Sequence, residues 1–259
     1  MRHAAAIGLP SAGADSNAPA CWRRMRHYDL VIFDFDGTLA DSFPWFLATI
    51  NGVADEFGFR RFDVARLDEI RSLSARELMA RSGLRWWRVP AVAQRMRALM
   101  SAQIARIALF DGIADLLAQL AQAGVHLALV TSNSHANVAH VLGPALLAQF
   151  RDVRCGAAVL GKRRKLRASL RACGVPAARA LCVGDEIRDA EAARQAGIAF
   201  AGVAWGYTLP AALQSHTPLP LLQRPDALRA LVLGAGACTQ SRLTQAGARG
   251  ACAAVGGDA

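Results

Sequence analysis

The chain has 259 residues, a formal net charge of +10 and 53% hydrophobic residues, with a mean hydropathy of +0.22. This length suffices for one sizeable core and a smaller second unit, while no apolar run reaches the ~18 residues of a membrane helix. We therefore exclude an integral membrane protein and expect a globular, cytoplasmic one.

All but two of the 30 basic residues are arginines, and the two lysines, Lys162 and Lys165, lie close together. Such a charge suits nucleic-acid or membrane-surface binding, or the attraction of phosphorylated substrates into a cleft. Because the arginines are spread along the chain and are not gathered with aromatic residues, we expect neither a nucleic-acid nor a membrane partner. The cysteines show no zinc-type spacing, which fits free thiols in a reducing compartment.

Residues 1–26 are rich in Ala, Ser, Gly, Pro and Arg without hydrophobic periodicity, so we expect a disordered extension. Arg23 and Arg24 are not followed by the apolar stretch of an export signal. Met25 stands just before the first predicted strand and is a candidate for the true initiating residue.

The first predicted element is a strand that ends in two carboxylates. Residues 30–33 are apolar and rich in β-branched side chains, which is typical of a strand buried on both faces of a parallel sheet. Asp34 and Asp36 follow and would point the same way, and Gly37 allows the chain to turn there. Two acids facing one spot require a divalent metal, a shared proton or full solvation, and a solvated turn is the plain alternative.

From residue 44 to residue 108 the hydrophobic pattern is helical, and we call this segment the cap. Apolar residues recur at spacings of three and four over residues 46–57, where Gly58 predicts a helix end, and over 91–107 after an interruption at Val89-Pro90. We interpret Trp86 and Trp87 as packing of the cap on the rest of the protein. The cap residues that are candidates to face a substrate are Arg76, Arg81, Arg85, Trp86, Trp87 and Arg88.

A second buried strand is predicted over residues 125–130, after a helix over 112–123, and it ends in Thr131, Ser132 and Asn133. A hydroxyl at a strand end followed by exposed backbone N–H groups is a suitable ligand for phosphate oxygens. Capping of the next helix is the alternative interpretation.

The two lysines lie at the start of the next predicted helix, in Gly161-Lys162-Arg163-Arg164-Lys165. A basic cluster at this end of a helix opposes the helix dipole, so its presence is informative. An ammonium is a compact point charge that fits between a carboxylate and a phosphate, whereas a guanidinium is a wide fork. A solvated helix face is the alternative.

A third apolar strand, residues 180–184, ends in Asp185, and Asp189 follows one helical turn later. With Asp34 these carboxylates supply the oxygen ligands that Mg²⁺ prefers; a plain acidic helix N-terminus is the alternative. A further strand over residues 198–203 and a helix over 224–233 follow. We expect the Gly/Ala-rich residues 234–259 to form a disordered tail.

Four segments follow one another along the chain: the strand end with Asp34 and Asp36, the strand end with Thr131, the two lysines, and Asp185 with Asp189. In this order they resemble the four motifs of the haloacid dehalogenase-like hydrolases. Leu-Ala-Asp-Ser over residues 39–42 resembles the phosphoglycolate-phosphatase-like branch. The resemblance implies an α/β fold, a Rossmann-like parallel sheet with helices on both faces plus an inserted all-helical cap. It divides the chain into a core of residues 27–43 and 109–233 and a cap of residues 44–108.

The resemblance also implies roles for the motif residues, with Asp34 as the nucleophile and Asp36 as the general acid and base. The family places its lysine before the helix that precedes the last acidic motif, so Lys162 is the first choice and Lys165 the second. The implied substrate-binding residues are Gly37, Thr131, Ser132, Asn133 and Lys162, and the implied Mg²⁺ ligands are Asp34, the Asp36 carbonyl, Asp185 and, through water, Asp189.

We therefore expect a Mg²⁺-dependent phosphomonoester hydrolase that acts on a small-molecule phosphate ester through an aspartyl-phosphate intermediate. An acid at Asp36 favours a phosphatase over a dehalogenase, because the family's dehalogenases lack one there. A phosphomutase would share every motif, and a non-catalytic, basic partner-binding protein is the other alternative. Phosphoglycolate is the default substrate of the resemblance, since no motif in the cap specifies one, and the sequence does not give the oligomeric state.

Overall fold

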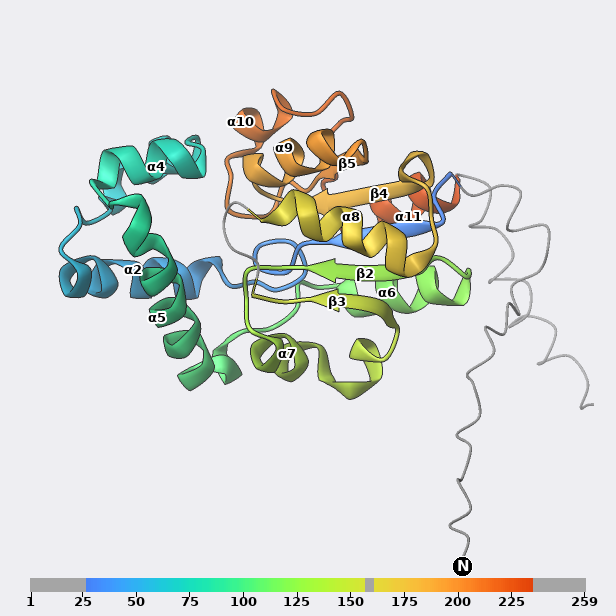
Figure 1. The fold of residues 1–259 in the computed structure, drawn as a ribbon, viewed down its shortest axis with the longest axis horizontal. Helices are drawn as coiled ribbons and strands as arrows, with labels where there is room; N and C mark the ends of the chain where they lie inside the picture. Colours follow the sequence, from blue (N-terminus) through green and yellow to red (C-terminus); the bar gives the residue numbers. More distant parts are fainter. Residues whose placement is uncertain (1–26, 157–160, 235–259) are drawn as a thin grey trace, which may run out of the picture.

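The structure is a computed structural model that describes residues 27–156 and 161–234 (Figure 1). The expectations for residues 1–26, for Met25 as the start and for the tail after Gly234 lie outside these described residues. Within the described ranges, none of the helices combines the length and apolarity that crossing a bilayer requires.

Five parallel strands form one sheet in the order β3-β2-β1-β4-β5, with β1 at its centre. In register, Phe33 of β1 stands opposite Leu129 of β2 and Val183 of β4. All four residues of β1 are buried, as expected for an apolar strand with neighbours on both sides. The strands are β1 (Leu30–Phe33), β2 (His126–Val130), β3 (Phe150–Arg154), β4 (Ala180–Gly184) and β5 (Ala199–Gly202).

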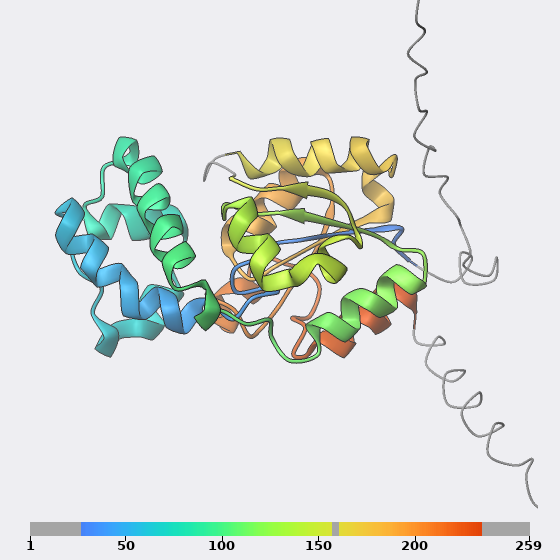
Figure 2. The same ribbon diagram turned by 90° about the horizontal axis from the view of Figure 1, so that it is seen from below.

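Helices cover both faces of the sheet (Figures 1 and 2). Because successive side chains of a strand point to opposite faces, Val31 and Phe33 pack in one apolar layer and Leu30 and Ile32 in the other. The first layer is closed by α6 (Ile113–Gln122), α7 (His135–Leu147) and α11 (Pro225–Leu233), and the second by α8 (Lys162–Cys173), α9 (Ile187–Ala196) and α10 (Pro210–Gln214).

The cap is helical and lies beyond the edge where the strands end (Figure 2). Helix α2 ends at Gly58, whose φ of +66° is the left-handed conformation that suits glycine. The expected interruption at Val89-Pro90 is wrong, because α5 begins there; a proline is tolerated in a first turn, where no N–H partner is needed. The cap contains α2 (Phe43–Phe57), η1 (Val64–Arg66), α3 (Leu67–Arg71), α4 (Ala75–Ser82), η2 (Trp86–Arg88), α5 (Val89–Ala102) and η3 (Ile104–Arg106).

The predicted packing of the two cap tryptophans is wrong. Trp86 is 75% exposed and Trp87 is 55% exposed. Their rings meet edge to face at 5.9 Å, and the guanidinium of Arg85 lies 5.4 Å from the Trp87 ring centre. The two side chains thus pack on each other in the short turn η2. The predicted fold class, a parallel α/β sheet with a helical insert, is confirmed by the structure.

Candidate active site

The predicted motif residues follow the ends of three neighbouring strands. Asp34 follows β1, Thr131 follows β2 and Asp185 follows β4. The Asp34 N–H donates to the Val183 carbonyl at 2.9 Å, which continues the pairing of β1 with β4 beyond the last strand residue. Because parallel strands end at one edge of the sheet, these side chains share the edge where open α/β sheets bind ligands.

A buried cluster of three carboxylates lies at this edge. One oxygen from each of Asp34, Asp185 and Asp189 lies within 4.8 Å of the others. The Lys162 ammonium lies 2.9 Å from Asp34 Oδ2 and 2.6 Å from Asp189 Oδ1, and its side chain is 10% exposed. The ammonium contacts two of these three buried acids, so the cluster keeps uncompensated negative charge, and an oxygen-binding divalent cation fits this donor set.

Burial sets the protonation of these groups. It raises the pKa of Asp34 from the usual 3.8 to about 7, although the Lys162 charge opposes that rise. It also raises the pKa of Asp185 well above its usual range, and the nearby acids Glu186 and Asp189 add to the effect. For Lys162, burial would lower the pKa, but the carboxylates of Asp189 and Asp34 outweigh it and raise the pKa, so the amine stays charged.

Asp185 is held by donors from two loops. Thr38 Oγ1 donates to Asp185 Oδ1 at 2.6 Å, and the Tyr207 N–H donates to Oδ2 at 2.8 Å. A Cβ atom at Gly37, where φ is +75°, would collide with the Asp185 carboxylate, and so would one at Gly206. Glycine at both positions lets the backbone approach this acid closely.

Asp189 supports the ammonium from the first turn of α9. Its Oδ1 contacts Lys162, and its Oδ2 accepts the Glu186 N–H at 3.2 Å as part of a capping box. The Glu186 carboxylate forms an ion pair with Arg188 at 2.5 Å. Lys165 points elsewhere, since its Nζ donates to the Cys155 carbonyl at 2.5 Å. Of the two lysines, Lys162 is therefore the one in contact with Asp34.

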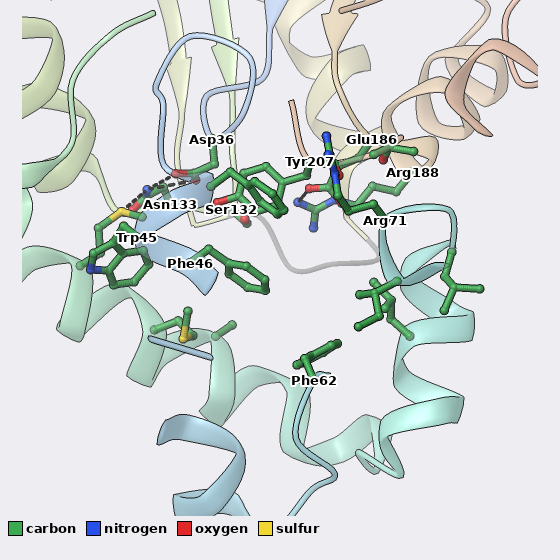
Figure 3. Close-up of a pocket in the computed structure, with 18 of the residues that line it drawn as sticks. Asp36, Trp45, Phe46, Phe62, Arg71, Ser132, Asn133, Glu186, Arg188 and Tyr207 are labelled. Atoms are coloured by element: carbon green, nitrogen blue, oxygen red, sulfur yellow. Dashed lines mark hydrogen bonds and ion pairs between the residues drawn. The ribbon is translucent and has the colours of Figure 1, made fainter. Parts of the chain in front are cut away.

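Asp36 faces the segment that follows β2. The Asn133 amide donates to both Asp36 carboxylate oxygens, at 3.1 and 3.0 Å (Figure 3). The Asn133 side chain is fixed in turn because its Oδ1 accepts from Asn137 at 2.9 Å, and its backbone N–H donates to Thr131 Oγ1 at 3.0 Å. Burial raises the pKa of Asp36, with the hydrogen bonds from Ser42 and Asn133 opposing the shift. The group is thus suited to carry a proton.

A cavity of about 290 Å³ opens above Asp36, between the edge of the sheet and the cap (Figure 3). Its polar side contains Asp36, Ser132 and Asn133, and Glu186 and Arg188 also line it. Its cap side is mostly apolar, with Phe46, Phe62, Ile70, Leu73, Leu78 and Met96.

The arginines of this cavity are not those predicted from the sequence. Among the described residues, Arg71, Arg97 and Arg188 line it, and Arg76, Arg81, Arg85 and Arg88 do not. No local pattern could have selected Arg71 or Arg97, because their position depends on how the cap sits over the sheet.

Arg71 joins the cap to the loop that holds Asp185. Its Nε donates to the Tyr207 carbonyl and its Nη2 to the Gly206 carbonyl, both at 2.9 Å. Its guanidinium lies 5.0 Å from the centre of the Phe43 ring. The Tyr207 hydroxyl also lies 3.0 Å from the Ser42 hydroxyl, so the loop is bonded on two sides.

Comparison with known proteins gives both family and structural matches. Residues 31–203 match the haloacid dehalogenase-like hydrolase family. A phosphoglycolate phosphatase from Synechococcus elongatus is 37% identical over 199 residues, which cover 76% of this chain and 94% of that protein. An N-acetylmuramic acid 6-phosphate phosphatase from Pseudomonas aeruginosa is 30% identical over 203 residues, covering 75% and 89%. A solved haloacid dehalogenase-like hydrolase from Streptococcus pneumoniae aligns with a TM-score of 0.64 at 21% identity, covering 79% and 98%.

Proposed function

The chain belongs to the haloacid dehalogenase-like hydrolases, and from this premise we propose that it is a magnesium-dependent phosphomonoester hydrolase of the phosphoglycolate-phosphatase-like branch. The observation that carries the proposal is the buried Asp34 carboxylate, 2.9 Å from the Lys162 ammonium and beside Asp185. This arrangement supplies a nucleophile, a cation for the phosphoryl oxygens and a metal-binding acid at one edge of the sheet.

The donor set fits Mg²⁺. We propose that Asp34, Asp185 and the Asp36 carbonyl hold the ion, with Asp189 supporting it through water. When bound, the ion supplies Lewis-acid polarisation of the phosphoryl group and compensates the charge of the clustered acids.

In the proposed reaction, Asp34 attacks phosphorus in line, and the bond to the leaving alcohol oxygen breaks as the aspartyl-phosphate forms. Lys162 opposes the rise that burial causes in the Asp34 pKa, which favours the ionised nucleophile, and it pairs with the phosphoryl oxygens. Thr131 and the N–H of the residue that follows it, Ser132, hold the equatorial oxygens.

Asp36 acts as the general acid in the first half of the reaction and as the general base in the second. It protonates the leaving alcohol oxygen and then takes a proton from the water that hydrolyses the aspartyl-phosphate. Two observations support this role: burial raises the Asp36 pKa, and the Asn133 amide fixes the carboxylate where it faces the cavity.

The substrate that we propose is a small-molecule phosphate ester. The relatives named above are phosphatases of a two-carbon acid and of an amino sugar, so membership of the family does not by itself determine which alcohol the substrate ester carries.

The test is phosphate release from p-nitrophenyl phosphate by the full chain. We expect turnover with Mg²⁺, none in excess EDTA and none in Asp34→Asn. Arg164→Gln, at an exposed arginine of α8, is the matched control and should keep the wild-type rate. Turnover that survives in Asp34→Asn would contradict the proposal, and isomerised sugar phosphate without free phosphate would identify a phosphomutase.

A further inference from the structure

The cavity above Asp36 is larger than a two-carbon alcohol needs. Its volume is about 290 Å³. An apolar protein cavity of about 150 Å³ is known to bind benzene, so this space can hold a body of aromatic size. Glycolate has only a few non-hydrogen atoms, so a glycolate ester would leave much of this space filled by water.

The walls of this space are apolar where the cap supplies them. Phe62 lies on the cap side, facing Tyr207 across the cavity, and Phe46 lies near Tyr207 (Figure 3). Ile70 of α3 and Met96 of α5 extend the apolar surface. Surfaces of this kind bind apolar bodies by removing them from water, with a few polar groups fixing the orientation.

The cations of the cavity are largely engaged within the protein. Arg71 donates to two backbone carbonyls, and Arg188 is ion-paired with Glu186. In the described part of the chain, the Arg97 guanidinium donates one hydrogen bond, to the Ser132 carbonyl at 3.3 Å. A bound carboxylate needs a cation of its own when it leaves water, and only Arg97 could provide one without breaking a stronger contact.

We propose that this enzyme acts on phosphomonoesters whose alcohol carries a predominantly apolar body of aromatic size, seated against Phe62. The inference rests on the phosphatase function proposed above and adds the class of leaving group. The phosphoryl group would lie at Asp34 and Lys162, the ester oxygen at Asp36, and the apolar body in the space lined by the cap.

The first experiment compares ethyl phosphate, 3-phenylpropyl phosphate and phosphoglycolate with the wild-type chain and Mg²⁺. Ethanol and 3-phenylpropanol are similar leaving groups, so a difference in kcat/KM between their esters reports binding of the body in the transition state. We expect kcat/KM for the phenylpropyl ester to be roughly 10- to 100-fold above that for ethyl phosphate, and above that for phosphoglycolate.

The outcomes separate the two proposals. Hydrolysis of all three esters without a phenylpropyl preference, or a preference for phosphoglycolate, would overturn the substrate class and leave the phosphatase function intact. The absence of phosphate release from these esters and from p-nitrophenyl phosphate would overturn the phosphatase function, and the inference with it.

Two variants test whether the preference for the phenylpropyl ester arises at the cap side of the cavity. Phe62→Ala should lower the phenylpropyl-to-ethyl ratio of kcat/KM several-fold, and Met96→Ala is a second variant that removes a different part of the same wall. Trp86→Ala is the matched control, because Trp86 is an exposed aromatic of the cap that does not line the cavity, and the ratio should not change. An unchanged ratio in both wall variants, or a loss largest in Arg97→Gln, would contradict an apolar body.

Discussion

The edge of the sheet and the cap use charge in opposite ways. At the sheet edge, Lys162 contacts two acids and is almost fully buried. In the cap, a pair such as Arg95 with Glu56 is 44% and 45% exposed. A buried charge must have a partner, whereas an exposed pair contributes little. Removing a charge at the sheet edge should therefore cost more stability than removing one from an exposed pair in the cap.

The largest expected effect concerns the proton carried at the sheet edge. Asp36→Asn should lower hydrolysis of an alkyl phosphate by about 10²- to 10⁴-fold, because the leaving alkoxide needs a proton. The loss should be smaller with p-nitrophenyl phosphate, whose phenolate leaves without one. Steady-state kinetics with both esters measure this, and Asp41→Asn, an exposed acid nearby, is the control. Equal losses with the two esters would speak against Asp36 as the acid.

The next prediction compares buried and exposed cations by stability. Lys162→Met leaves the Asp34 and Asp189 carboxylates without their ammonium and should destabilise the fold by about 3–5 kcal/mol at pH 8. Lys165→Met removes one hydrogen bond to a carbonyl and should cost about 1 kcal/mol. For the exposed cap pair, Arg95→Met should cost at most about 1 kcal/mol. Urea unfolding without metal measures the free energy of unfolding of all three variants. Similar losses of stability in Lys162→Met and Arg95→Met would show that burial does not decide what a lost cation costs.

A third prediction concerns the metal-free protein. The folded-state pKa of Asp34 is raised from 3.8 to about 7, so between these values the folded protein binds more protons than the unfolded chain. Its contribution to stability is present below pH 4 and is lost as the pH rises to 7, by up to about 1.4 kcal/mol per pH unit. Asp185 shifts in the same direction.

The measurement is urea unfolding in EDTA at pH 5 and pH 7.5, for the wild type and Asp34→Asn. The fall in stability with pH should be shallower in the variant. Mg²⁺ at 100 times its Kd should restore about 2.7 kcal/mol at pH 7.5. The same pH dependence of stability in the wild type and the variant, or no stabilisation of either by Mg²⁺, would contradict this prediction.

The smallest expected effect lies where the two regions meet. Arg71→Lys replaces a fork that reaches two carbonyls by a point charge that reaches one, which loosens the loop that donates to Asp185. Losing one hydrogen bond predicts about a fivefold rise in the Mg²⁺ concentration for half-maximal activity. A Mg²⁺ titration checks this, with Arg76→Lys on the exposed face of α4 as the control. An unchanged Mg²⁺ requirement would show that the cap does not act on the metal-binding acid through this contact.

Much of the fold could be predicted because β1, β2 and β4 are continuous apolar runs between helical patterns. Strand β3 gives no such signal, since three of its residues, Arg151, Asp152 and Arg154, are charged and it lies at the edge of the sheet. The Asp152 carboxylate pairs with Arg154 of the same strand at 2.7 Å and accepts from Ser169 of α8 at 2.6 Å, and the second contact is one that only the tertiary structure provides.

For the site, the sequence could place residues on strand ends, because parallel strands end at one edge. It could not place the cap over that edge, and so Arg71 and Arg97 were missed and the exposed tryptophans were misinterpreted. The roles of Asp34, Asp36, Lys162 and Asp185 stay predictions that the measurements above address.

The most direct test of the central claim is to trap the covalent intermediate. The full chain is mixed with Mg²⁺ and p-nitrophenyl phosphate, quenched within the first turnover and reduced with borohydride, which converts an aspartyl-phosphate to homoserine. Peptide mass spectrometry should then find homoserine at position 34, and only in samples that contained substrate. Homoserine at position 36, or intact aspartate at position 34 while phosphate is being released, would contradict the account.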